Sequence, residues 1–175
     1  MVRVGKFEKV SFEQFSKDIK DTLGDKYLDA KIKYMYDDIT LPKRATKMSA
    51  GYDFFSPFEF TLQPNETIKI PTGIRVLMED SWVLKCYPRS GLGFKYRLQL
   101  NNTVGIIDSD YFYSDNEGHI FAKITNDTNE NKTISLKQGD GFMQGIFVEY
   151  GITVDDEVTE IRNGGFGHSS GVCLL

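Results

Sequence analysis

The chain has 175 residues, carries a net charge of −4 and is 40% hydrophobic, which suits one soluble domain with its own core. The acidic balance argues against broad nucleic-acid binding, since that function needs a basic surface. The N-terminal region has no long apolar run, so neither a signal peptide nor a membrane span is expected, and a reducing cytoplasm is the expected compartment.

Residues 1–30 are expected to form an extension before the main domain. Ser11 and Gln14 have the spacing of a capping box, in which the two side chains satisfy free amide groups at the start of a helix. Apolar residues follow at helical spacing, and Gly24 can end the helix in a left-handed conformation. The pattern predicts an amphipathic helix over about residues 11–23, whose aromatic face packs on the main body or on a neighbouring subunit.

The middle of the chain is divided into short segments in which apolar and polar residues alternate, as is typical of β-strands. Turn signals rich in Pro, Gly, Asn and Asp separate them. Many short strands at close spacing predict an all-β sandwich or barrel. The expected strands cover residues 31–36, 58–62, 67–70, 73–77, 82–87, 104–107, 119–124, 132–136 and 142–148.

Five unusual stretches follow one another in a fixed order along most of the chain. Each alone is weak evidence, because short motifs match by chance. They are Ser49-Ala50-Gly51-Tyr52-Asp53; Pro88-Arg89-Ser90-Gly91-Leu92; Asn102 with Gly105-Ile106-Ile107-Asp108-Ser109-Asp110-Tyr111; Gly139-Asp140 with Gln144; and a glycine-rich tail from Arg162 to Gly171.

Together the five motifs resemble those of the deoxyuridine triphosphatases (dUTPases), which hydrolyse dUTP to dUMP and pyrophosphate. The resemblance implies an all-β, dUTPase-like jelly roll over residues 31–155 that assembles as a homotrimer. It implies Mg2+ as the cofactor and a tail over residues 156–175 that closes over the active site. It also implies the family's role, which is to limit uracil in DNA and supply dUMP for thymidylate synthesis.

The candidate general base is Asp108. Hydrolysis of the α–β phosphate bond needs a base for the attacking water, charge neutralisation and exclusion of bulk water. Taken alone, Asp108 is more typical of an aspartate that caps a β-turn. The resemblance assigns it instead to orienting and activating the attacking water and to contacting the sugar 3′-hydroxyl.

The third motif also supplies the candidate nucleoside pocket. An aromatic residue such as Tyr111 is usually part of a core. The resemblance implies that the Tyr111 ring lies under the deoxyribose and leaves no room for a 2′-hydroxyl. It implies that Asn102 and the backbone of Gly105, Ile106 and Ile107 read the uracil edge and exclude the thymine methyl group.

The phosphate contacts are expected from the second and fourth motifs. Arg89 can fork to phosphate oxygens, Ser90 offers a hydroxyl and Gly91 lets backbone amides approach closely, although the stretch alone is more typical of a turn. Gln144 can donate to the α-phosphate. The resemblance also implies that Asp53 holds magnesium through water, which suits an ion bound mainly through substrate phosphates.

The tail contains one large apolar residue, Phe166, among glycines and serines. The resemblance implies that Phe166 and Gly167 close over the uracil. Arg162, Ser169 and Ser170 would then bind the γ-phosphate.

Three features depart from the usual dUTPase pattern. Gly141 stands where the fourth motif commonly has Arg, and the fifth motif is one residue shorter between Arg162 and its glycines. The segment over residues 112–116 adds length beside the third motif and is expected to form an enlarged loop.

Two other functions remain open on the sequence. The related dCTP deaminases share the fold but carry Arg-Ser-Ser where this chain has Arg89-Ser90-Gly91. A trimeric regulatory protein could capture a protein partner through the N-terminal helix or the loop over residues 114–116, as some phage members of the family do.

Overall fold

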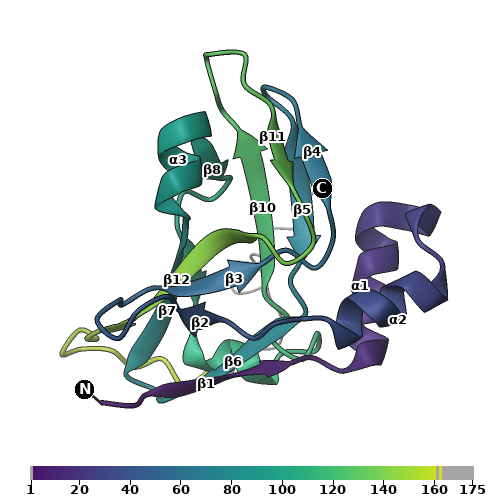
Figure 1. Ribbon diagram of the computed structural model, residues 1–175. Coiled ribbons are helices and arrows are strands. Elements are labelled where there is room, and N and C mark those ends of the chain that lie inside the picture. Colours follow the sequence, from purple (N-terminus) through teal and green to yellow (C-terminus); the bar gives the residue numbers. More distant parts are fainter. Residues whose placement is uncertain (1, 161, 163–175) are drawn as a thin grey trace.

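The chain, described for residues 2–160 and 162 by a computed structural model, is built mainly of antiparallel strands (Figure 1). The largest sheet has five strands in the order β2-β3-β12-β7-β9. They are β2 (Lys43–Arg44), β3 (Tyr52–Phe55), β12 (Gly141–Glu149), β7 (Trp82–Pro88) and β9 (Gly105–Ile107). The other strands pair as β5 (Thr67–Pro71) with β10 (Phe121–Asn126), β10 with β8 (Leu98–Leu100), β4 (Phe60–Leu62) with β11 (Ile134–Leu136), and β1 (Gly5–Lys9) with β6 (Ile74–Met78).

The antiparallel sheets confirm the predicted all-β jelly roll, and they enclose a core of large apolar side chains. Phe54 of β3, Leu84 of β7 and Phe142 of β12 are at most 1% exposed. Every strand predicted between residues 58 and 148 is present, with its ends shifted by no more than two residues.

The predicted N-terminal helix is present as α1 (Phe12–Leu23). The Ser11 hydroxyl accepts a hydrogen bond from the backbone N–H of Gln14 at 3.1 Å, and Gly24 ends the helix with φ of 62°. The other half of the expected capping box is absent, because the Ser11 N–H donates to Glu117 at 2.7 Å. The cap is thus completed by a residue far along the chain.

The prediction of a strand over residues 31–36 is wrong, because this segment lies in α2 (Asp29–Asp37). Ile32 and Met35 are both 0% exposed and join the same core cluster as α1. They are three positions apart and therefore share one face of a helix. Packing against the core has decided the structure where local alternation pointed the other way.

Strand β1 was not expected, and it makes residues 5–9 part of the body. It pairs with β6 from Gly5 opposite Met78 to Lys9 opposite Ile74. The Phe7 and Phe54 rings pack in a T-shaped arrangement with a centroid separation of 5.6 Å.

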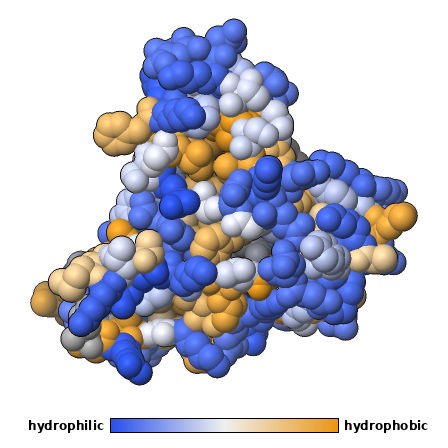
Figure 2. All heavy atoms as spheres, in the orientation of Figure 1, coloured by the Kyte–Doolittle hydropathy of each residue, from blue (hydrophilic) through white to orange (hydrophobic). Residues whose placement is uncertain are grey.

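The surface in the view of Figure 2 is mostly hydrophilic, with hydrophobic residues reaching it beside α3 (Ser90–Tyr96) and over the five-stranded sheet. Phe94 of α3 is 95% exposed and Ile106 of β9 is 52% exposed. Within the described part of the chain, no helix combines the length and apolar character needed to cross a membrane.

Candidate active site

The third motif lines a cavity of about 880 Å3. Its strand β9 lies at the edge of the five-stranded sheet, where Gly105 pairs with Cys86 of β7. A side chain at position 105 would place its Cβ 3.1 Å from the Cys86 Cβ, so glycine allows the two strands to approach. Burial raises the pKa of the Cys86 thiol to about 12, which keeps this cavity residue uncharged. The predicted residues in the lining are Asn102, Gly105, Ile106, Ile107, Asp108, Tyr111 and Arg162.

Asp108 follows β9 and precedes the short 3-10 helix η2 (Ser109–Tyr113). It occupies the N-cap position, but its side chain makes no capping hydrogen bond, so the turn-cap explanation fails for its carboxylate. The side chain is 45% exposed and faces the cavity. Burial raises the pKa of the Asp108 carboxyl above its usual value, and the charge of Arg162 offsets only part of this rise.

Arg162 forms ion pairs with both carboxylates of the third motif, those of Asp108 and Asp110. Its guanidinium forms an ion pair with Asp108 and donates from Nε to Asp110 at 2.9 Å. The guanidinium carbon lies 5.9 Å from the centre of the Tyr111 ring. Within a single chain, Arg162 therefore lies beside the candidate base.

Tyr111 lies in η2, and its ring lines the cavity. The residue is 6% exposed. Its hydroxyl donates to the His119 carbonyl at 2.7 Å and accepts from the Asn116 side chain at 2.8 Å. Burial raises the pKa of the Tyr111 phenol, so it stays a neutral donor near neutral pH.

The second motif lines a separate hollow of about 310 Å3 that shares no lining residue with the first cavity. β7 ends at Pro88, and Arg89 is the N-cap of α3, so this stretch begins a helix as well as turning the chain. Arg89, Ser90 and Gly91 line the hollow with Gly141. A Cβ added at Gly91 would meet nothing within 4 Å.

The first and fourth motifs lie on the strands beside this hollow. Asp53 of β3 pairs in register with Gln144 of β12, and its carboxylate lies 3.3 Å from Nε of Arg89. The Gln144 amide donates to the Pro88 carbonyl at 3.3 Å. A Cβ added at Gly141 would lie 2.7 Å from Nη1 of Arg89, so the missing arginine of the fourth motif leaves room for Arg89.

The donor set suits a metal ion that keeps most of its water. Among the described residues, no group of three or more His, Cys, Asp or Glu side chains could enclose a metal. Asp53 is a single carboxylate, 18% exposed, beside the cationic Arg89. This arrangement fits Mg2+ carried largely by substrate phosphates and does not fit a cage made only of protein ligands.

Comparison with known proteins assigns the chain to a family. A sequence model of the dUTPase family matches residues 37–170. The chain belongs to the dUTPase family. The deoxyuridine 5'-triphosphate nucleotidohydrolase of Lactococcus lactis is 40% identical over 138 residues, which are 77% of this chain and 91% of that protein.

Solved dUTPases share the fold. The dUTPase of Streptococcus mutans is 31% identical, with a TM-score of 0.60 over 84% of this chain and 97% of that chain. A mutant dUTPase from phage phi11 of S. aureus is 25% identical, with a TM-score of 0.56 over 70% of this chain and 91% of that one.

The dUTPase motifs thus fall into two groups within one chain. The second motif and Asp140 of the fourth line the smaller hollow, and Asp53 of the first contacts Arg89 there. The third motif and Arg162 line the larger cavity. Phe166, Gly167, Ser169 and Ser170 lie outside the described residues. Two unpredicted lysines, Lys69 and Lys123, also line the large cavity, where they face each other across β5 and β10. In the sequence, Lys69 and Lys123 alternate with apolar residues. This pattern predicted strands but did not indicate that the two lysines line a cavity.

Proposed function

We propose that this chain hydrolyses dUTP to dUMP and pyrophosphate, with Asp108 as the base. The observation that carries the proposal is that the half-buried Asp108 carboxylate and Tyr111 line one cavity, which is large enough for a nucleoside. Family membership supports the reaction, and the relative from Lactococcus lactis carries the name of this activity.

The reaction follows from the chemistry of these side chains. Asp108 accepts a proton from a water molecule, whose oxygen attacks the α-phosphorus. The bond from that phosphorus to the bridging oxygen breaks, and pyrophosphate leaves. Arg89, Ser90 and Gln144 bind phosphate oxygens and stabilise the charge that develops there. The raised pKa of Asp108 makes it a stronger base than an ordinary aspartate once Arg162 has moved away.

Asp53 is the residue that would hold Mg2+, through water. The ion supplies charge neutralisation on the triphosphate. A mutant dUTPase from phage phi11 coordinates a structural Mg(II) ion, which supports a metal role in the family.

We further propose that the working form is a homotrimer with sites formed between chains. The smaller hollow, which would bind the phosphates, and the larger cavity, which would bind the nucleoside, are separate within one chain. One substrate molecule must nevertheless reach both. Phe94 and Ile106, beside these two regions, are exposed apolar residues of the kind that subunit contacts cover. Arg162, Phe166, Ser169 and Ser170 would complete the site from the tail.

A nucleotide panel tests the activity. Pyrophosphate release from dUTP, dTTP, dCTP and UTP is measured with Mg2+, together with ammonia release from dCTP. We expect pyrophosphate from dUTP and little from the other three. Ammonia from dCTP would favour a deaminase, and no release from dUTP would refute the proposal.

Mixed assemblies test the shared site. Arg89→Ala and Asp108→Asn are each expected to be inactive. When the two are unfolded, mixed and refolded together, random assembly should place one intact Arg89 and one intact Asp108 in roughly one site in four. Recovery of about that share of activity supports shared sites. No recovery, with trimers present by light scattering, would place both residues of a site in one chain.

A further inference from the structure

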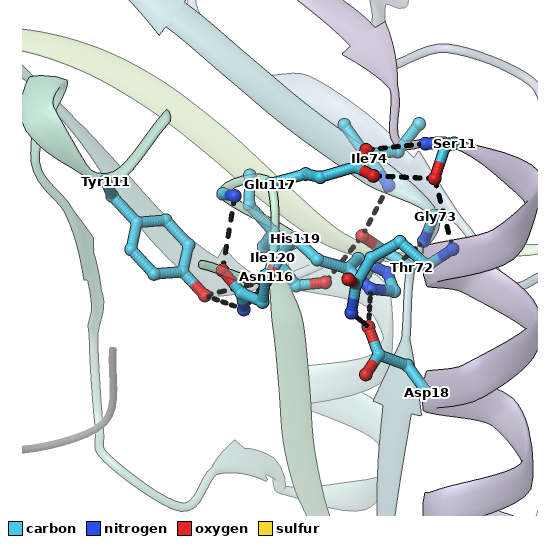
Figure 3. Close-up of polar contacts among 12 residues, drawn as sticks. Ser11, Asp18, Thr72, Gly73, Ile74, Tyr111, Asn116, Glu117, His119 and Ile120 are labelled. Atoms are coloured by element: carbon cyan, nitrogen blue, oxygen red, sulfur yellow. Dashed lines mark hydrogen bonds and ion pairs between the residues drawn. The ribbon is translucent and has the colours of Figure 1, made fainter. Parts of the chain in front are cut away.

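A buried polar network joins the N-terminal helix to the segment that carries Tyr111 (Figure 3). The Tyr111 hydroxyl points toward residues 116–119, where it binds the Asn116 side chain and the His119 carbonyl. The phenol has one proton to donate, and the His119 carbonyl receives it. The position of this carbonyl therefore fixes the far end of the ring.

His119 is itself held on both ring nitrogens and is 0% exposed. Its Nε2 accepts the Gly73 N–H at 2.7 Å. A backbone N–H can only donate, so Nε2 carries no proton and the proton lies on Nδ1. Nδ1 then donates to the Asp18 carboxylate at 2.5 Å. The ring is thus oriented by one residue of α1 and by the backbone amide of the residue just before β6.

Asp18 is placed for this contact by its own helix. Its Oδ2 also accepts from the Gln14 side chain at 2.8 Å, one turn earlier in α1. Burial raises the pKa of the Asp18 carboxyl, but the hydrogen bonds from His119 and Gln14 outweigh it and leave the pKa below its usual value. The group is therefore a charged acceptor in the neutral pH range.

A second contact ties the same segment to the start of α1. Both Glu117 oxygens bind Ser11, one accepting its N–H at 2.7 Å and the other its hydroxyl at 2.6 Å. Gly118 lies between the two anchored residues with φ of 70°. Residues 117 and 119 are therefore fixed on α1, which lies outside the match to the dUTPase family.

We propose that Asp18 and His119 are positioning residues for Tyr111, so that α1 determines how strictly the site excludes ribonucleotides. This inference rests on the proposed function and on the assignment of the Tyr111 ring to the sugar. Without Asp18, the buried Nδ1–H of His119 loses its acceptor, and moving the ring is the available relief. The His119 carbonyl moves with its ring, and the Tyr111 hydroxyl follows. The ring then gives the sugar more room, and the 2′-hydroxyl of UTP is tolerated.

The test is the ratio of kcat/KM for UTP to that for dUTP, measured in the full chain. We expect Asp18→Ala to raise this ratio about 5- to 30-fold, the change that corresponds to one or two hydrogen bonds. Asp18→Asn keeps an acceptor oxygen and should restore a ratio near that of the wild type. Asp21→Ala removes an exposed carboxylate from the same helix and should leave the ratio unchanged.

Tyr111→Phe completes a double-mutant cycle. It removes the hydroxyl and should raise the ratio by itself. Asp18→Ala added to Tyr111→Phe should then have little further effect, because Asp18 acts through that hydroxyl. Additive effects, or a wild-type ratio in Asp18→Ala, would overturn the proposal. A wild-type ratio in Tyr111→Phe overturns it even where Asp18→Ala does not fold. A wild-type chain that releases no pyrophosphate from dUTP is a different outcome, which refutes the proposed function and this inference with it.

Discussion

Arg162 donates a hydrogen bond to the carboxylate of Asp108, the proposed base, and a second to the neighbouring Asp110. A carboxylate bound in this way is a weakened proton acceptor, and the guanidinium is unavailable to a phosphate. We expect the triphosphate to draw Arg162 off both carboxylates, so that substrate binding itself frees the base.

The ion pair between Arg162 and Asp108 predicts how a mutation will change the pH dependence of activity. Burial raises the pKa of Asp108, and Arg162 lowers it in part. Asp108 works only when deprotonated, so activity falls as the pH drops through this pKa. Arg162→Gln removes the lowering effect, and we expect the acid limb of kcat/KM for dUTP to move to higher pH. This limb reports the free enzyme, in which the pair is formed. The control is Arg97→Gln, which breaks an exposed pair with Asp127 and should not move the limb. An unmoved limb in Arg162→Gln would show that the pair does not tune Asp108.

Two shortened chains separate Arg162 from the residues beyond it. A chain ending at Arg162 lacks Phe166, and base stacking on an aromatic side chain is worth about 1–3 kcal/mol, or roughly 5- to 150-fold. A chain ending at Glu160 lacks Arg162 as well. We expect kcat/KM for dUTP to fall in both shortened chains by a factor in this range or more. Only the chain that ends at Glu160 should shift the acid limb of the pH profile of kcat/KM. Full activity in the chain that ends at Arg162 would show that residues 163–175 have no role in turnover.

Gly118 is expected to be essential for stability. Its φ is 70°, and an added Cβ would lie 2.7 Å from the Phe112 Cα and the Tyr111 carbonyl oxygen. Gly139 also has a positive φ, of 86°, but a Cβ there would meet nothing within 4 Å. Gly139→Ala should therefore lose only about 1–3 kcal/mol of stability, because a residue with a side chain is strained in this backbone conformation. Gly118→Ala should lose more stability than this. The free energy of unfolding of both variants is measured at the same protein concentration. Equal losses would mean that the segment around Tyr111 adapts to the extra atom.

The parts of the fold that depend on neighbours in sequence could be predicted. Ser11 caps α1 and Gly24 ends it, because both effects act within one helical turn. The strands from residue 58 onward follow from alternation and turn residues. The segment over residues 31–36 could not be predicted in this way. Its helix depends on burying Ile32 and Met35 against a core assembled from distant parts of the chain.

The site shows the same limit. Several third-motif residues line one cavity, and they are near neighbours in sequence. The contact between Asp53 and Arg89 depends on the strand order β3-β12-β7, which no local pattern encodes. Ser11 and Glu117 are 106 positions apart. The polar run Ser114-Asp115-Asn116-Glu117 gave no sign that Gly118 and His119 are buried.

Turnover of dUTP by Asp108→Asn is the most direct test of the proposed base. The amide keeps the shape of the side chain but cannot accept the proton. Asp110→Asn is the matched control, since Asp110 also binds Arg162 but has no proposed part in proton transfer. We expect Asp108→Asn to bind dUTP normally and to lose kcat by about 10²–10⁴-fold, whereas Asp110→Asn retains most of it. Turnover by Asp108→Asn close to that of the wild type would contradict the proposed mechanism.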